Sequence, residues 1–172
     1  MRYSFCPQCG NKLTTKLAGD DGKVPFCTEC NKYWFDSFAS SAMVLVANEY
    51  DEIVLLRQGY ISDIYTTLVS GYISPGETAE QTAVREVKEE VGITLDSLEY
   101  DGTVWFDKGD LLIHCYVGRT HKSDLVLSQE VDSAEWTKAE DVVKTLYPDA
   151  PGNAAYALYK NFMKRRGTPL ST

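Results

Sequence analysis

The sequence predicts an α/β protein, an α/β/α sandwich with a mixed sheet, preceded by a small N-terminal unit. Three observations support this prediction. Six short runs of apolar and β-branched residues have the pattern of strands, three longer segments have helical patterns, and two pairs of cysteines stand near the N-terminus. By length, residues 39–172 make one domain, whereas residues 1–38 are too few to build a core of their own.

The predicted strands cover residues 41–47, 53–57, 68–70, 98–106, 111–119 and 134–137. Turn residues separate several of them, at 48–51 and at 107–110. Helices are predicted at about 78–91, at 138–146 and at 153–166, and the last has Ala155, Leu158, Tyr159 and Phe162 on one face. Mixed strands with helices on both sides make the sandwich.

The cysteines form two Cys-x-x-Cys pairs, Cys6 with Cys9 and Cys27 with Cys30. Two such pairs at this separation predict a tetrahedral zinc site with four thiolates and no open position for catalysis. We therefore expect residues 1–38 to be a zinc ribbon whose folding free energy comes from the metal. The fifth cysteine, Cys115, lies in an apolar run and is expected to be an inert core residue.

Charge and hydropathy limit the partners of the chain. Residues 1–38 carry one net positive charge and the whole chain carries a net charge of -8, which disfavours binding to nucleic acid. The first ten residues contain no apolar signal-peptide core, and the longest apolar run, 42–47, is too short to span a membrane. We expect a reduced, cytoplasmic setting, in which zinc is favoured over disulfides.

Four aromatic residues close the ribbon segment, and they have two possible uses. Tyr33, Trp34, Phe35 and Phe38 could dock the ribbon onto the larger domain or onto a second subunit. Alternatively, they could line the substrate cleft.

The segment 71–93, GYISPGETAEQTAVREVKEEVGI, contains most of the functional information. In the predicted helix, Glu86, Glu89 and Glu90 are spaced i, i+3 and i+4, so they share one face. Like charges at this spacing repel, and a divalent cation removes the repulsion. Oxygen ligands without histidine or thiol favour Mg2+ or Mn2+.

The same segment supplies its own structural support. Gly92 follows the helix at the position where a left-handed residue is favoured. Gly71, with the later Pro75 and Gly76, predicts a tight loop before the helix. Arg85 is expected to pair with Glu77 and so to hold loop and helix together.

This segment resembles the signature of the Nudix hydrolases, enzymes that cleave a nucleoside diphosphate linked to another group, and every fixed position of that signature is present. The resemblance implies the Nudix fold and the following roles. Glu86 and Glu90 would be the principal metal ligands, and Glu89 would be either a further ligand or the base that activates water. The backbone carbonyl of Ser70 would join the metal shell. A carboxylate from a later loop would complete it: Glu130, six residues before Trp136, or else Asp132 or Glu135.

A zinc ribbon followed by a Nudix domain is similar to the arrangement of the NADH pyrophosphatases. Their downstream motif, Ser-Gln-Pro-Trp-Pro-Phe-Pro-x-Ser, is replaced by GTVWFDKGD at 102–110, where the tryptophan is kept and every proline is missing. NADH, ADP-ribose, FAD or a similar compound, or a nucleoside triphosphate, are therefore all candidate substrates. The alternative function is a module that senses a nucleotide without cutting it. Members of this family are often dimers, so the resemblance leaves a homodimer as an open alternative to a monomer.

Substrate contacts outside the signature are weakly marked. Arg57 ends a strand and could bind a phosphate, because its guanidinium matches two oxygens at once. Trp105 and Phe106 alternate across a strand, so we expect one of them in the core and the other stacked on a base. His114 and His121 have no metal-ligand spacing and are expected to be structural.

Overall fold

A computed structural model describes residues 3–167 and divides the chain into two compact units, residues 1–38 and residues 39–172. The first unit contains an antiparallel sheet of β1 (Thr14–Leu17), β2 (Lys23–Cys27) and β3 (Lys32–Tyr33), with a 3-10 turn, η1 (Gly19–Asp21), between the first two strands. The rings of Phe26 and Tyr33 are 4.9 Å apart between centroids, and the Lys16 ammonium lies 4.3 Å above Phe26. Because this sheet buries few side chains, aromatic and cation–π contacts are a large share of its packing.

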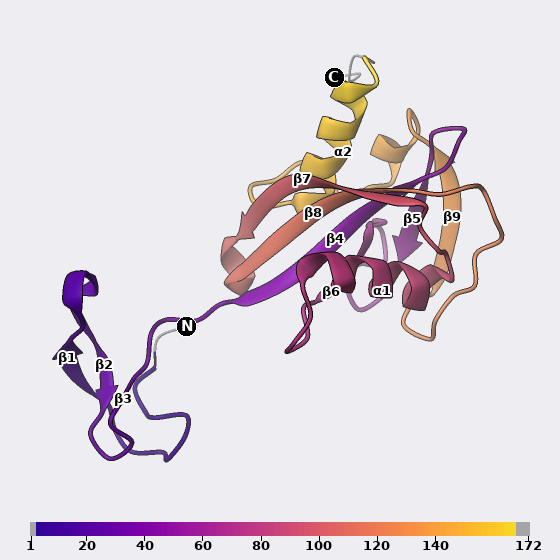
Figure 1. The fold of residues 1–172 in the computed structure, drawn as a ribbon. Coiled ribbons are helices and arrows are strands. Elements are labelled where there is room, and N and C mark those ends of the chain that lie inside the picture. The colour runs from indigo at the N-terminus through magenta and orange to yellow at the C-terminus, as the bar shows by residue number, and fades with distance from the viewer. Residues whose placement is uncertain (1–2, 168–172) are drawn as a thin grey trace. The chain divides into compact units, whose positions relative to one another are not determined.

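The second unit is built on a six-stranded mixed sheet (Figure 1). Its strands are β4 (Ala39–Ala47), β5 (Glu52–Arg57), β6 (Val69–Tyr72), β7 (Ser97–Phe106), β8 (Leu111–Arg119) and β9 (Ser133–Lys138). The order is β7-β8-β4-β5-β9, and β6 pairs with the first half of β4. The central pair, β4 with β8, is parallel, whereas the other pairs are antiparallel.

The two helices of this unit cover opposite faces of the sheet (Figure 1). Alternate residues of β4 point to opposite sides, so Leu45 packs in one core cluster and Val44 in the other. The first cluster contains the apolar face of α2 (Ala154–Arg165), including Leu158, and the second contains Val87 from α1 (Ala79–Val91). The predicted α/β/α sandwich is therefore confirmed.

The strand predictions agree with the structure to within one or two residues at each end, and strand 111–119 agrees at both ends. The predicted helix at 138–146 is wrong. Only a 3-10 turn, η3 (Val142–Lys144), forms there. The chain after it is extended because its backbone bonds elsewhere: Thr145 O accepts from Thr66 N at 2.9 Å, and Tyr147 N donates to Thr66 O at 3.1 Å. A further 3-10 turn, η2 (Asp107–Gly109), joins β7 to β8.

The buried Cys115 lies in the core of the sheet, and burial raises the pKa of its thiol to about 12, which agrees with an inert core residue. Across residues 3–167, neither helix has the length and hydropathy that a membrane span requires.

Candidate active site

The position of the carboxylates is set by how α1 begins and ends. The Thr78 side chain accepts from Gln81 N, and the Gln81 side chain accepts from Thr78 N, which is a complete capping box. At the other end, Gly92 has φ 75°, the left-handed conformation that the sequence predicted. With its ends fixed, α1 buries Val87 and Val91 against the sheet. Val84, by contrast, is exposed.

Glu90 is a buried carboxylate with one bonded and one unbonded oxygen. It is only 3% exposed, and Gln58 Nε2 donates to its Oε1 at 2.8 Å. Its Oε2 is buried without a hydrogen-bond partner in the structure. Burial raises the pKa of Glu90 to about 7, and the neighbouring charge of Glu86 adds to the rise. The ionised form of this buried carboxylate is favoured by a counter-charge, which a cation at Oε2 would supply.

Glu86 lies against the backbone of Gly71. A Cβ atom at Gly71 would stand 1.9 Å from Glu86 Oε1, so only glycine leaves room for this carboxylate. The side chain of Glu86 is 14% exposed, and burial raises its pKa. The requirement for glycine at this position therefore comes from the close approach of a side chain of α1, and the φ of Gly71 is not in the left-handed region.

Arg85 joins the loop to the carboxylates. Its Nε donates to Glu77 Oε1 at 2.7 Å and its Nη2 to Glu77 Oε2 at 2.9 Å, which is the pairing that the sequence predicted. The Arg85 guanidinium lowers the pKa of Glu77 to about 2. Arg85 Nη1 also donates to Glu86 Oε1 at 2.6 Å and to Glu89 Oε2 at 2.9 Å. One guanidinium thus neutralises part of the charge of three carboxylates.

The remaining acids lie at different depths. Glu89 is 58% exposed and shares Arg85 Nη1 with Glu86. Glu130 lies close enough to add to the rise in the pKa of Glu86 and of Glu90. Asp132, the first alternative to Glu130, accepts from Gly59 N at 2.6 Å, and Glu135 lies exposed on β9. Of these three later acids, Glu130 is the one that the structure brings to Glu86 and Glu90.

A cavity of about 780 Å³ includes these carboxylates in its lining. Its acidic lining residues are Glu86, Glu90 and Glu130, and Gln58, Ser70 and Gly71 also line it. Its lining further includes the apolar and aromatic side chains of Met43, Tyr65, Phe106, Leu111, Ile113 and Tyr147. This volume lies within the range of small-molecule sites in proteins.

The three predicted substrate contacts have different positions. Phe106 lines the cavity and packs against the core cluster on the α2 face. Trp105 points to the other side of β7 and is exposed. Arg57 does not line the cavity, because its Nη1 donates to the carbonyls of Asp63 and Ile64 at 2.9 and 3.0 Å. Arg57 therefore holds the loop that follows β5 through these two hydrogen bonds. Of the three residues, only Phe106 lines the cavity.

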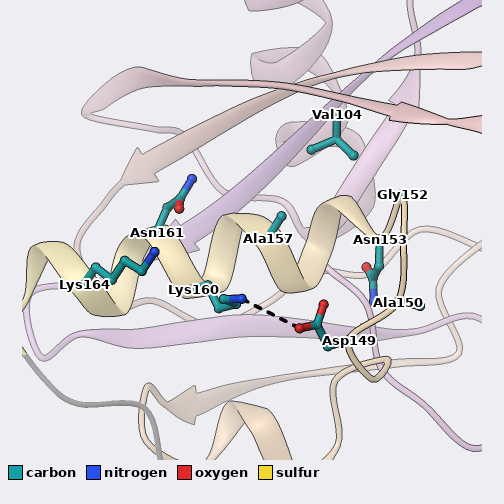
Figure 2. Close-up of a pocket in the computed structure, with 9 residues that line it drawn as sticks. All are labelled: Val104, Asp149, Ala150, Gly152, Asn153, Ala157, Lys160, Asn161 and Lys164. Atoms are coloured by element: carbon teal, nitrogen blue, oxygen red, sulfur yellow. Dashed lines mark ion pairs between the residues drawn. The ribbon is translucent and has the colours of Figure 1, made fainter.

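A second, smaller hollow of about 250 Å³ runs along α2 (Figure 2). Its charged groups are the lysines Lys160 and Lys164 and the carboxylate Asp149, and Lys160 pairs with Asp149 at 3.7 Å. With one carboxylate already paired, it lacks the acid cluster that hydrolysis of a diphosphate requires. The larger cavity is therefore the candidate active site.

Comparison with known proteins agrees with this geometry. Residues 37–158 match the family model for the NUDIX domain. The chain belongs to the Nudix family.

Among curated Nudix relatives, the NAD-capped RNA hydrolase NudC of Pseudomonas aeruginosa (strain LESB58) is 31% identical over 134 residues, which cover 77% of this chain and 46% of that protein. The protein with the same name from Pseudomonas syringae pv. syringae (strain B728a) is 28% identical over 172 residues, covering 97% of this chain and 58% of that protein. The chain spans about half the length of these relatives.

Solved structures show the same fold. The crystal structure of a NUDIX hydrolase from Nitrosomonas europaea has a TM-score of 0.68 and 16% identity, and the match covers 99% of this chain and 97% of that one. The NUDIX domain of Shewanella oneidensis NrtR, complexed with ADP ribose, has a TM-score of 0.64 and 16% identity, covering 83% and 94% of the two chains. At these identities the likeness concerns the Nudix fold alone.

The four predicted zinc ligands of this Nudix protein come together in the N-terminal unit. The sulfurs of Cys6, Cys9, Cys27 and Cys30 all lie within 4.8 Å of one another. Cys6 and Cys30 are 3.9 Å apart between sulfurs, and Cys9 and Cys27 are 3.5 Å apart. Four thiolates about 2.3 Å from a central zinc would be spaced about 3.8 Å apart, so the cluster fits a tetrahedral ion. Within residues 3–167 this is the only group of three or more His, Cys, Asp or Glu side chains whose ligand atoms lie so close together. The carboxylates of Glu86, Glu90 and Glu130 are further apart.

Most of the residues that line the cavity were not predicted from the sequence, and Gln58, Tyr65 and Tyr147 are three of them. Gln58 follows β5 directly, and a polar residue at the end of a buried strand was the available signal. Tyr65 and Tyr147 lie in loops far apart in the sequence, and no local pattern marks them. Their place in the site depends on the backbone bonds that join residues 66 and 145–147.

Proposed function

We propose that the chain is a Mg2+- or Mn2+-dependent pyrophosphatase that hydrolyses a nucleoside diphosphate linked to another moiety, such as NADH, ADP-ribose or FAD. The products are a nucleoside monophosphate and a phosphorylated remainder. The observation that carries this proposal is the unpartnered Oε2 of the buried Glu90, which lines the large cavity together with Glu86 and Glu130. The names of the NudC relatives, which act on an NAD cap, support the same class of reaction.

The residues proposed to bind the cation are Glu86, Glu90 and Glu130, with the carbonyl of Ser70. When bound, the cation would activate a water for attack on phosphorus and stabilise the charge that develops on the phosphate oxygens. Gln58 orients Glu90 by occupying its Oε1, so that Oε2 remains for the cation. Gly71 leaves room for the Glu86 carboxylate to face the same point.

Glu89 is proposed as a further ligand or as the base that takes a proton from the attacking water. Its exposure leaves it free to exchange protons with solvent, while its bond to Arg85 Nη1 keeps it beside Glu86. Gly71, Glu77, Arg85 and Gly92 are proposed as structural support of this arrangement.

Two further assignments belong to this proposal. Residues 1–38 form a zinc ribbon and residues 39–172 the Nudix hydrolase domain. Zinc is proposed at the four cysteines because their sulfur spacing fits a tetrahedral ion. Metal analysis of the purified protein should find one tightly bound zinc per chain, and a disulfide between Cys6 and Cys27 in freshly isolated protein would contradict it.

The function is tested by incubating the Mg2+-loaded protein with NADH, NAD+, ADP-ribose, FAD, diadenosine polyphosphates and nucleoside triphosphates. NAD-capped RNA belongs in the panel because the relatives are named for it, whereas the net charge of -8 predicts weak binding to its RNA body. Monophosphate release should be lost in Glu90→Gln and retained in the matched control Glu140→Gln, which changes an exposed glutamate outside the cavity. If the protein bound a nucleotide and did not hydrolyse it, the result would support the nucleotide-sensing alternative in place of the enzyme.

A further inference from the structure

The loop between β8 and β9, which contains Glu130, is bonded first to the helix of the site. Val126 N donates to Val91 O at 3.0 Å, and Ser128 N donates to Glu90 O at 3.2 Å. Both acceptors belong to the last turn of α1, and the second belongs to the residue that supplies the buried carboxylate. The part of the loop that precedes Glu130 is therefore fixed to the same helix turn as Glu90.

Asp132, the last residue of this loop, makes two bonds to the end of β5. Its backbone N donates to Arg57 O at 2.9 Å, and its carboxylate Oδ2 accepts from Gly59 N at 2.6 Å. Arg57 and Gly59 are the two sequence neighbours of Gln58. The Gln58 Nε2 donates to Glu90 Oε1 at 2.8 Å, so Asp132 holds the backbone on both sides of the side chain that orients Glu90.

The position of Asp132 is that of a residue that acts through its neighbours. Among the described residues, the lining of the large cavity includes Gln58 and Glu130 but not Asp132. A Cβ atom at Gly59 would stand 3.2 Å from Asp132 Oδ2, so the carboxylate lies close against this backbone. A hydrogen bond from a backbone N–H to an ionised carboxylate is roughly twice as strong as one between neutral groups.

We propose that Asp132 is a positioning residue for the reaction, because it fixes Gln58 and Glu130 relative to each other. The inference rests on the proposed function, since it takes Glu90 and Glu130 to bind the cation. The backbone bond of Asp132 does not depend on its side chain, whereas the bond to Gly59 N needs an acceptor there. Without this acceptor the exposed Gly59 N bonds to water, and the backbone beside Gln58 is no longer tied to the loop that carries Glu130.

The test measures Mn2+ binding in the absence of substrate, by electron paramagnetic resonance of the free ion, and then kcat and KM. Asp132→Ala should weaken Mn2+ binding about ten-fold, which is the lower end of the loss that follows removal of a group orienting a metal ligand. The kcat should also fall, with an unchanged KM for the nucleotide. Asp132→Asn should retain most of the affinity, because its amide oxygen can still accept from Gly59 N. Both variants remove the same negative charge, so a loss confined to alanine comes from the hydrogen bond.

The matched control is Glu49→Ala. Glu49 Oε2 accepts from Lys122 N at 2.7 Å, so this variant also removes an exposed carboxylate that bonds to a backbone N–H of another loop. The bond lies at the turn between β4 and β5, at the opposite end of β5 from Gln58, and Glu49 does not line the cavity. Glu49→Ala should therefore leave Mn2+ binding unchanged.

A coupling measurement asks whether Asp132 acts through Gln58. When Gln58→Met is already present, adding Asp132→Ala should weaken Mn2+ binding by a smaller factor than it does in the wild type, because part of the same effect has been lost. The proposal is overturned if Asp132→Ala binds Mn2+ as tightly as Glu49→Ala does, if Asp132→Asn loses as much affinity as Asp132→Ala, or if the two losses multiply in full.

Failure of this inference can be told apart from failure of the proposed function, because Mn2+ binding is measured without substrate. If Asp132→Ala weakens Mn2+ binding in a protein that hydrolyses no nucleotide, the result counts against the proposed function alone. If the wild type hydrolyses a nucleotide and Asp132→Ala leaves Mn2+ binding unchanged, the result counts against the role of Asp132 alone.

Discussion

Substitution of the buried Glu90 by glutamine should stabilise the cation-free protein at alkaline pH. Burial raises the pKa of Glu90 from 4.5 to about 7, so the folded state retains its proton to higher pH than the unfolded chain does. Between these two values the folded state binds more protons, and stability falls as pH rises. Glutamine stays neutral, and its carbonyl oxygen can still accept from Gln58 Nε2.

The magnitude follows from the same two values. One pKa unit corresponds to ~1.4 kcal/mol, so at pH 8, above both pKa values, the ionised carboxylate costs the folded state about 3 kcal/mol. Near pH 5 the folded state is still protonated and the cost falls to less than about 1 kcal/mol. Glu90→Gln should therefore raise the free energy of unfolding by about 3 kcal/mol at pH 8 and by much less at pH 5.

The assay is urea unfolding of chelator-treated wild type and variant, followed by a probe in the Nudix domain and repeated with saturating Mg2+. The cation should stabilise the wild type and have little effect on Glu90→Gln, because ligand binding to the folded state is what shifts the equilibrium. The exposed Glu140→Gln variant should behave as wild type. If Glu90→Gln changed the free energy of unfolding equally at pH 5 and pH 8, or at neither pH, the argument from burial would be refuted.

Four other perturbations have defined outcomes. Gln58→Met should lower kcat about 10- to 100-fold with an unchanged KM, because Glu90 loses the bond that orients it; an unchanged kcat would contradict this. Glu89→Gln should lower kcat while reducing Mn2+ affinity less than Glu90→Gln does, since Glu89 is exposed; equal losses of affinity in the two variants would make it a principal ligand. Gly71→Ala should reduce activity on the order of 100-fold, because its Cβ displaces the Glu86 carboxylate, and full activity in a folded variant would exclude the close approach. Removing metal from the cysteine cluster with a strong chelator should open residues 1–38 to protease while residues 39–167 stay resistant, and protection of both units would argue against a structural metal.

The sequence predicted those parts of the site that depend on local rules. Spacing within the segment 71–93 predicted helix α1, its left-handed end at Gly92 and the ion pair of Arg85 with Glu77. The need for glycine at position 71 was predicted too, but for a different reason: the structure shows that the position is crowded by the Glu86 carboxylate. Crowding of this kind comes from a residue on another element, so the spacing alone could not show it.

The remaining features depend on tertiary contacts. The helix predicted at 138–146 fails because Thr145 and Tyr147 bond to Thr66, which no local pattern reveals. For the same reason most of the cavity lining was not predicted, since it is assembled from separate strands and loops. Arg57 was placed correctly at a strand end, but which carbonyls it would reach depended on the path of the following loop.

The connection between β5 and β6 joins the Glu90 carboxylate to the segment before α2. It contains Gln58, which donates to Glu90, and eight residues later Thr66, which exchanges two backbone hydrogen bonds with residues 145 and 147. Any coupling between cation binding at Glu90 and nucleotide binding against this connection must be reciprocal: the factor by which a nucleotide tightens Mn2+ binding equals the factor by which Mn2+ tightens nucleotide binding.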